Sequence, residues 1–388
     1  MMKTHAAILR EQPGQWQIEE VDLDDPGPTE VLVEMVATGL CHSDEHATSG
    51  DMPINLPIVG GHEGAGIIRA IGSQVTDYAV GDHIVTSFIP SCGKCRWCAM
   101  GLQNLCDFGA NTLIGNQPSG GYRMHSNGED LATMAALGTF AEWQVFDEAS
   151  IVKIDPDIPL DVAALVACGV PTGYGSAVNS ADIHNGDVVI IFGVGGIGMN
   201  AVQGAAAAGA SHIVVVDPAP FKREKAPEFG ATEVFAEAQA AIDFVRSITN
   251  GQGADAAICT PGVLHGDIIG TATDAIRKGG IVVVTSMSPL GEVGIPTDLF
   301  SLVMNQKRIQ GALYGSWSPR YAIPTLLGLY KQGKLKLDEL VTNRYTLDQI
   351  NDAYQDMRDG KNIRGVILLS PVATESPAAL REAVTVGA

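Results

Sequence analysis

Residues 187–200 read DVVIIFGVGGIGMN, a run of β-branched and aromatic residues that leads into a glycine-rich turn and then an alanine-rich segment. A buried strand, a glycine turn and a helix in this order predict a doubly wound parallel sheet that binds a dinucleotide. The glycines let the pyrophosphate approach the N-terminus of the helix, where backbone amides point at it. They are Gly193, Gly195, Gly196 and Gly198. The same glycines could instead form a packing turn.

Further apolar runs follow at helix-length intervals, which predicts a sheet covered on both faces. The six candidate strands are residues 188–192, 213–216, 233–235, 256–259, 281–285 and 309–314. Six is the number that a full doubly wound fold requires. Asp217 follows the second strand about 20 residues after Gly198, as expected of a carboxylate that binds the adenosine ribose. Because this carboxylate would repel a 2′-phosphate, the sequence favours NAD over NADP.

A cluster of cysteines lies in residues 91–106, which read SCGKCRWCAMGLQNLC. Its members are Cys92, Cys95, Cys98 and Cys106. Four thiolates at this spacing can close a tetrahedral shell around one zinc ion and leave no open position, so the predicted site is structural. Redox CxxC pairs, reduced thiols without metal and an iron–sulfur cluster are the alternatives.

A second, dispersed set comprises Cys41, His62 with Glu63 in GGHEGAG, and Cys168 in VACGVPTG. Two sulfurs and one imidazole leave the fourth zinc position open to water or substrate, as in catalytic zinc sites. Asp44, three residues after Cys41, could orient the imidazole of His62. Taken alone, such residues are more commonly core or turn residues.

Together and in this order, the motifs resemble those of the zinc-dependent medium-chain alcohol dehydrogenases. The resemblance covers roughly residues 4–369 and rests on GLCHSDEH, GHEGAG, the four cysteines, Cys168 and GVGGIG. It implies a GroES-like, mostly-β catalytic domain and a Rossmann NAD-binding domain. The expected boundaries are 1–175 and 316–370 for the catalytic domain with a zinc lobe at about 91–107, 176–315 for the NAD domain, and 371–388 for a tail.

The resemblance also implies roles for individual residues. Cys41, His62 and Cys168 would bind the catalytic zinc, with Glu63 just behind it as an occasional ligand. Ser43 would receive the alcohol proton and pass it through the nicotinamide ribose to His46. The implied cofactor contacts are His42, Thr172, Lys222 and Arg364, and the implied pocket walls are Phe88 and Leu313. His42 departs from the family pattern, since many relatives carry an arginine there.

Two segments resemble the nicotinoprotein subgroup, whose members hold NAD permanently. One is 107–138, expected as a long loop, and the other is DPAPFKRE at 217–224. The implied activity oxidises primary alcohols to aldehydes, and runs in reverse, with two zinc ions per subunit and bound NAD(H). An external acceptor, such as N,N-dimethyl-4-nitrosoaniline (NDMA) or a mycofactocin-type carrier, would reoxidise the cofactor. The alternatives are a conventional NAD-exchanging alcohol dehydrogenase, a thiol-dependent formaldehyde dehydrogenase and a non-catalytic redox sensor.

The length, composition and charge of the chain indicate its domain organisation, the partners it disfavours and its location in the cell. With 388 residues, 46% of them hydrophobic, and a net charge of −20, the chain is expected to form two globular domains. The charge disfavours nucleic acid and anionic membranes as partners. The sequence has no apolar stretch long enough for a membrane span and no signal-peptide core, so a cytoplasmic location with reduced thiols is expected. Family analogy predicts a homo-oligomer, a dimer or tetramer, paired through 298–310.

Overall fold

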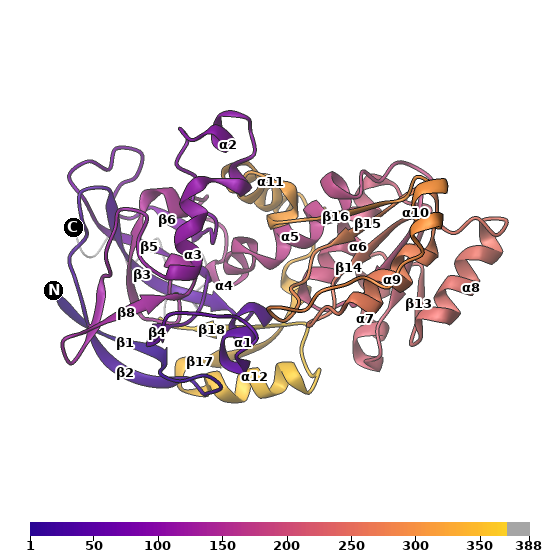
Figure 1. Ribbon diagram of the computed structural model, residues 1–388. Helices are drawn as coiled ribbons and strands as arrows, with labels where there is room; N and C mark the ends of the chain where they lie inside the picture. The colour runs from indigo at the N-terminus through magenta and orange to yellow at the C-terminus, as the bar shows by residue number, and fades with distance from the viewer. Residues whose placement is uncertain (371–388) are drawn as a thin grey trace. The chain divides into compact units, whose positions relative to one another are not determined.

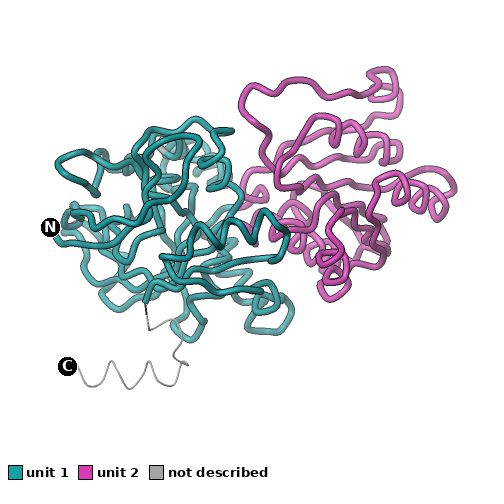
Figure 2. The backbone as a smooth tube through the Cα atoms, turned by 90° about the horizontal axis from the view of Figure 1, so that it is seen from below, with its two compact units in different colours: residues 1–168, 318–388 teal, residues 169–317 magenta. Residues whose placement is uncertain are grey.

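The computed structural model describes residues 1–370, and of Asn111 it describes only the backbone. The chain packs as two units, which Figure 2 shows in different colours. Within the described residues, the first unit comprises 1–168 and 318–370, and the second comprises Gly169–Trp317. The expected tail, 371–388, lies outside the described residues.

The first boundary lies before helix α5 (Gly169–Gly175), whereas the sequence placed it after residue 175. Two glycines explain why α5 packs with the second unit. A Cβ at Gly173 would lie 2.0 Å from the carbonyl oxygen of Ile197, and one at Gly175 would lie 2.4 Å from that of Gly315. Only glycine permits such close backbone contacts, so they join this helix to the second unit.

The second unit is built on a six-stranded parallel sheet (Figure 1). Its strands are β11 (Val188–Phe192), β12 (His212–Val216), β13 (Glu233–Phe235), β14 (Ala254–Cys259), β15 (Ile276–Val284) and β16 (Arg308–Gly311). They are arranged in the order β13-β12-β11-β14-β15-β16. This order confirms the predicted doubly wound sheet. The prediction for the last strand was too long, because the chain turns before Tyr314, where φ is 56°.

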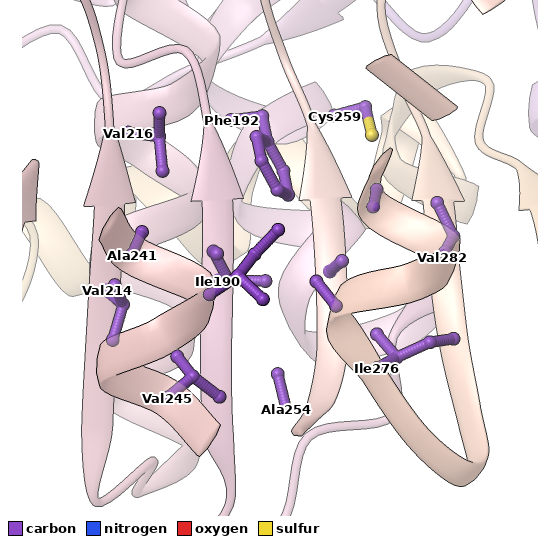
Figure 3. Packing of buried hydrophobic residues seen from close by; sticks show 14 of the residues in the cluster. Ile190, Phe192, Val214, Val216, Ala241, Val245, Ala254, Cys259, Ile276 and Val282 are labelled. Atoms are coloured by element: carbon purple, nitrogen blue, oxygen red, sulfur yellow. The ribbon is translucent and has the colours of Figure 1, made fainter. Parts of the chain in front are cut away.

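Helices cover this sheet and bury its apolar side chains. They are α6 (Gly196–Ala208), α7 (Pro220–Phe229), α8 (Ala238–Ile248) and α9 (Gly266–Ala275), whereas the short helix α10 (Leu299–Met304) has no buried residue. Figure 3 shows Ala241 and Val245 of α8 packed over Val214 and Ile190 of the sheet. Strands buried on both faces need apolar residues at every position, which is why their sequences run without alternation. The strand order reverses between β11 and β14, and ligands bind such sheets at that point.

The first unit is mostly β, as expected. Its closed barrel comprises β1 (Met2–Leu9), β2 (Gln17–Leu23), β7 (Met124–Ser126), β8 (Glu129–Thr133) and β4 (Ile58–Val59). Its seven-stranded sheet comprises β10 (Ile151–Lys153), β6 (His83–Thr86), β5 (Glu63–Ile71), β3 (Glu30–Gly39), β18 (Arg364–Leu368), β17 (Val341–Thr346) and β9 (Trp143–Asp147). Its α-helices are α1 (His42–Ser49), α2 (Arg96–Ala99), α3 (Asn111–Ile114), α4 (Leu160–Ala163), α11 (Pro319–Lys331) and α12 (Ile350–Arg358).

The segment 107–138 is not the long loop that the sequence suggested, because it contains α3 and supplies β7 and β8 to the barrel. Met124 and Leu131 of these strands are fully buried in the barrel core. The carboxylate of Glu30, also fully buried, accepts two hydrogen bonds of 2.8 Å from Arg123. It also accepts a hydrogen bond from the hydroxyl of Ser119. Apolar packing and a buried ion pair therefore fix this segment to the unit.

Among residues 1–370, no helix has the length and apolar character needed to cross a membrane.

Candidate active site and metal centres

The four clustered cysteines meet in the lobe around α2. Their sulfur atoms all lie within 4.8 Å of one another, with 3.8 Å between Cys92 and Cys98 and 4.0 Å between Cys95 and Cys106. Sulfurs at the corners of a tetrahedron around zinc, with bonds of about 2.3 Å, are about 3.8 Å apart. The backbone amide of Cys95 donates to the sulfur of Cys92 at 3.3 Å, and that of Cys98 to the sulfur of Cys95 at 3.5 Å. The geometry therefore fits a four-thiolate metal centre.

The thiols of the lobe differ in their pKa values. A backbone hydrogen bond from Cys98 lowers the pKa of the Cys95 thiol to about 6. Burial raises the pKa of Cys98 to about 12 and also raises that of Cys106. One thiol is thus ready to bind a metal as thiolate, while the buried ones need a cation to offset the cost of their charge.

The second set of candidate ligands comes together although its members are far apart in sequence. Strand β3 pairs antiparallel with β5 so that Gly39 lies opposite Glu63, which brings the chain at Cys41 beside His62. Cys168 reaches the same place from the segment before α5. One ligand atom from each of Cys41, His62, Glu63 and Cys168 lies within 4.8 Å of the others, and all four residues are buried. These residues could hold one metal ion.

The carboxylate of Asp44 lies beside the imidazole of His62. Nδ1 of His62 lies 3.2 Å from Oδ2 and 3.3 Å from Oδ1 of the Asp44 carboxylate, which is fully buried. The same carboxylate accepts a hydrogen bond of 3.0 Å from the backbone amide of Gly61. Because Nδ1 faces this carboxylate, Nε2 is the nitrogen left to bind a metal. Burial alone would lower the pKa of His62, but Asp44 and Cys41 outweigh it and raise this pKa well above its usual value.

Glu63 forms a buried ion pair with Arg364 from the start of β18. Neither side chain is more than 5% exposed. Gly39 makes room for the pair, since a Cβ there would lie 2.2 Å from Oε2 of Glu63. Burial raises the pKa of Glu63 to about 7, although Arg364 opposes the shift. The sequence suggested a pyrophosphate contact for Arg364 but gave no sign of this pairing.

The pKa values of the two buried thiols in this cluster, Cys41 and Cys168, are shifted in opposite directions. A hydrogen bond from Cys168 lowers the pKa of Cys41 well below its usual value, while the same contact and burial raise the pKa of Cys168. Together with Glu63 and Asp44, they make this cluster rich in groups that bind cations. Its donor set of two sulfurs, one imidazole and one carboxylate fits zinc, which prefers nitrogen and sulfur ligands.

Three further predicted residues belong to the first unit, and two of them contact this cluster. Oγ of Ser43, in the first turn of α1, lies 3.5 Å from the sulfur of Cys41. The ring of Phe88 stands edge-on to that of His62, with 6.0 Å between centroids. His46 is buried on α1, and its Nδ1 lies 3.2 Å from Oδ2 of Asp51. Asp51 was not among the predicted residues.

Two other predicted residues, His42 and Leu313, belong to different units. The ring of His42 lies 6.2 Å from that of His46. Leu313, expected as a pocket wall, belongs to the second unit and is 42% exposed.

The glycine turn after β11 has the form that the sequence predicted. Gly193 has φ 88°, and a Cβ there would lie 2.8 Å from the backbone of Pro261. A Cβ at Gly198 would lie 2.0 Å from the carbonyl oxygen of Gly193. At Gly195, which precedes α6, a Cβ would meet no described atom within 4 Å. The outer glycines are thus required by packing, while Gly195 leaves open space at the helix N-terminus.

Asp217 is buried just beyond β12. Its Oδ2 accepts a hydrogen bond of 2.8 Å from the amide of Val194, and its Oδ1 one of 2.9 Å from that of Ala219. The carboxylate therefore joins the glycine turn to the start of α7. Arg223, which the sequence did not single out, donates at 2.7 Å to the carbonyl of Asp217.

Lys222 and Thr172, two of the predicted cofactor contacts, also lie in the second unit. Lys222 is half-buried in the first turn of α7. Thr172 on α5 is 6% exposed, and its hydroxyl has no hydrogen-bond partner within residues 1–370. A buried hydroxyl without a partner is costly, so a ligand that bonds to Thr172 would remove that cost.

Comparison with known proteins gives two family matches. Residues 27–156 match the alcohol dehydrogenase GroES-like domain, and residues 196–332 match the zinc-binding dehydrogenase family. The chain is 52% identical to putative alcohol dehydrogenase D of Mycobacterium tuberculosis, over 95% of this chain and 100% of that protein. It is 48% identical to the NDMA-dependent alcohol dehydrogenase of Amycolatopsis methanolica, with the same two shares. The structure of benzyl alcohol dehydrogenase from Acinetobacter calcoaceticus superposes with a TM-score of 0.89 at 32% identity, covering 95% of this chain and 100% of that one.

Proposed function

Because the chain belongs to the zinc-type medium-chain alcohol dehydrogenase family and is a zinc-dependent oxidoreductase, we propose that it oxidises primary alcohols to aldehydes through tightly bound NAD. The reverse reaction uses the same site, and an external acceptor reoxidises the cofactor. The observation that carries the proposal is the buried cluster of Cys41, His62, Glu63 and Cys168, whose ligand atoms lie within 4.8 Å of one another.

Cys41, His62 and Cys168 would hold the catalytic zinc, and the four clustered cysteines the structural one. When bound, zinc supplies a Lewis acid that makes the alcohol proton easier to remove, and NAD supplies the hydride acceptor. The carboxylate of Asp44 fixes the imidazole of His62 so that Nε2 faces the cluster. Arg364 forms an ion pair with Glu63 beside the other ligand atoms, so the buried carboxylate has a compensating charge.

Proton removal would begin at Ser43, whose hydroxyl lies beside the sulfur of Cys41. A hydroxyl can accept one proton while donating another, so Ser43 orients the alcohol and passes its proton on. His46 is the acceptor we propose at the end of this path, because an imidazole is the side chain that most readily takes up a proton near neutral pH. The ring of Phe88 would form an apolar wall beside His62.

The second unit would bind NAD, and its boundaries would mark the cofactor domain. The open space at Gly195 would take the pyrophosphate, with the amides of α6 pointing at it. Asp217 would accept from the adenosine ribose and disfavour NADP, while Lys222 would lie beside it. Thr172, with its unpartnered hydroxyl, would contact the bound cofactor. His42 would face the phosphates where many relatives carry arginine.

The external acceptor in this proposal is suggested by the 48% identity to an alcohol dehydrogenase described as NDMA-dependent, over nearly the whole chain. For tight binding of NAD the reason is local, because the guanidinium of Arg223 donates to the backbone carbonyls of Asp217 and Pro218 at 2.7 and 2.8 Å and holds this turn in place. A ribose site already ordered before binding loses less entropy when the cofactor binds, so the cofactor leaves more slowly.

Extensively desalted protein is expected to retain about two zinc ions and nearly one NAD(H) per subunit. Metal analysis measures the zinc, and chromatography after denaturation identifies the released nucleotide. Bound NAD(H) should also undergo turnover with an alcohol and NDMA when no NAD is added. Two zinc ions with no nucleotide would overturn the bound-cofactor proposal and leave an alcohol dehydrogenase that exchanges NAD.

We further propose that two copies of the chain associate through the second unit. Its α10 exposes four large apolar side chains, which are 65–74% accessible: Leu299, Phe300, Val303 and Met304. Strand β16 is the edge strand of the parallel sheet and follows α10 directly. An exposed apolar patch beside an open sheet edge is the kind of surface that a second copy covers.

Phe300→Glu is expected to shift the protein from an oligomer toward monomer, because it places a charge in this apolar patch at a side chain that is 74% exposed. Analytical ultracentrifugation measures the change. Val80→Glu, at an apolar residue that is 60% exposed in the first unit, is the matched control and should leave the oligomer unchanged. A Phe300→Glu protein that sediments like the wild type would place the interface elsewhere.

The seven cysteines support a reducing, cytoplasmic location. None of them forms a disulfide, and six belong to the two candidate metal clusters. Both clusters need their thiols reduced, a condition that the cytoplasm maintains.

A further inference from the structure

We propose that Asp51 is a positioning residue for proton transfer: it holds the imidazole of His46 in the orientation that accepts the alcohol proton and compensates the charge that then forms. The inference deepens the proposed function and rests on the proton path from Ser43 to His46. It adds a residue that neither sequence motif nor spacing indicated.

The contact between the two side chains joins a buried group to the surface. His46 is 3% exposed, and its Nδ1 lies 3.2 Å from Oδ2 of Asp51. The side chain of Asp51 is 35% exposed. The carboxylate therefore stands between the buried imidazole and water.

Asp51 is held in place by its surroundings. The hydroxyl of Ser49 donates to its Oδ2 at 2.8 Å, and the backbone amide of Met52 donates to the carbonyl of His46 at 3.2 Å. The side-chain amide of Gln12 donates to the carbonyls of Ala47 and Met52, at 2.5 and 3.1 Å. These hydrogen bonds fix the turn after α1, so the carboxylate of Asp51 already faces Nδ1 of His46 without a change of conformation.

This arrangement determines which nitrogen of His46 can act. A carboxylate accepts a hydrogen bond and donates none when ionised, so the proton of the neutral imidazole is held on Nδ1. Nε2 is then the acceptor. When the alcohol proton arrives there, an imidazolium forms, and the carboxylate 3.2 Å from Nδ1 compensates its positive charge. The imidazolium later releases one proton to solvent, so the site returns to its starting charge.

The test compares two asparagine variants in the zinc- and NAD-loaded enzyme. Asp51→Asn keeps the shape of the side chain but removes the charge, and kcat for alcohol oxidation is expected to fall about tenfold while KM stays within about twofold. Asp130→Asn is the matched control, because it removes a carboxylate 2.8 Å from the imidazole of His125 elsewhere in the same unit. It should leave kcat unchanged.

Single-turnover measurements compare the rate of proton release in Asp51→Asn with that in the wild type. Proton release, followed with an indicator dye, is expected to slow by about tenfold in Asp51→Asn. Zinc content and thermal midpoint should match those of the wild type, which separates an effect on the proton from an effect on folding. Release at the wild-type rate would overturn the proposal.

A double variant shows whether Asp51 acts through His46. His46→Ala should lose activity, and adding Asp51→Asn to it should cause no further loss, because the imidazole to be positioned is gone. An equal loss with and without His46 would show a structural role and overturn the proposal. Loss in His46→Ala with none in Asp51→Asn would overturn the role of Asp51 alone. Full activity in His46→Ala would overturn the proposed proton path itself.

Discussion

His62→Ala is expected to lower kcat/KM for alcohol oxidation on the order of 10⁴-fold, because it removes one of three ligands that would hold the catalytic zinc. The two thiols and Glu63 that remain are buried, so solvent cannot easily supply the missing ligand. The fold should persist. Asp44 would lose one partner but keep the amide of Gly61 at 3.0 Å, which limits the cost to about 1–3 kcal/mol.

Metal analysis should find about one zinc per subunit in this variant, since the four-cysteine lobe would stay loaded. His62→Gln is a second variant in which the side-chain amide can still donate to Asp44, so it separates metal loss from the loss of that hydrogen bond. His125→Ala is the matched control, because it removes an imidazole between two carboxylates outside the cluster. Normal activity in His62→Ala would show that the catalytic zinc is held elsewhere.

The parallel sheet of the second unit was predictable because strands buried on both faces have uninterrupted runs of apolar residues. Strand β13 begins and ends where the sequence placed it, at Glu233–Phe235, and β11 does so at Val188–Phe192. The glycine turn was equally visible, since close backbone contacts at Gly193 and Gly198 tolerate no side chain. Local physical requirements of this kind act over a few residues, so a single sequence reveals them.

The barrel of the first unit was harder to predict. Strands β7 and β8 are only three and five residues long and lie among glycines and polar residues that resemble a loop. Their strand character depends on pairing with β2 and β4, which lie far away in the sequence. The ion pair between Glu30 and Arg123 also joins residues that are far apart in the sequence, and neither residue belongs to a motif.

In the candidate site, too, local features were predictable from the sequence and contacts between distant segments were not. Residue type and spacing indicated the four-cysteine set, because zinc restricts its ligands to a few side chains. The dispersed set of Cys41, His62 and Cys168 was weak by spacing alone and depended on the resemblance to the alcohol dehydrogenases. Arg364 pairs with Glu63 across 301 residues of sequence, and no local pattern predicts such a contact. Asp51 lies only five residues from His46, but at that separation an aspartate at a helix end is indistinguishable from a capping or turn residue.

Cys98→Ser is expected to destabilise the protein while sparing the chemistry. Cys98 is 7% exposed, and its sulfur lies 3.8 Å from that of Cys92 inside the lobe. Serine is a poor zinc ligand, so the lobe would lose its metal and the three remaining thiols their bound cation. The lobe also reaches α11, because the hydroxyl of Ser318 donates to the side chain of Gln103. We expect a loss of about 3 kcal/mol or more, which lowers the thermal midpoint by roughly 6–12 °C.

The control for this change is Cys259→Ser, which introduces the same hydroxyl at a buried cysteine outside both clusters. Burial raises the pKa of Cys259 to about 12, so this thiol is neutral and its replacement removes no metal. Cys98→Ser should contain about one zinc per subunit and keep its activity per folded molecule below the transition, whereas Cys259→Ser should contain about two. If Cys98→Ser retained two zinc ions and the wild-type midpoint, the lobe would not be a structural zinc centre. If it lost its activity in proportion to its zinc, the division of labour between the two clusters would be wrong, because the lobe would then contribute to the reaction itself.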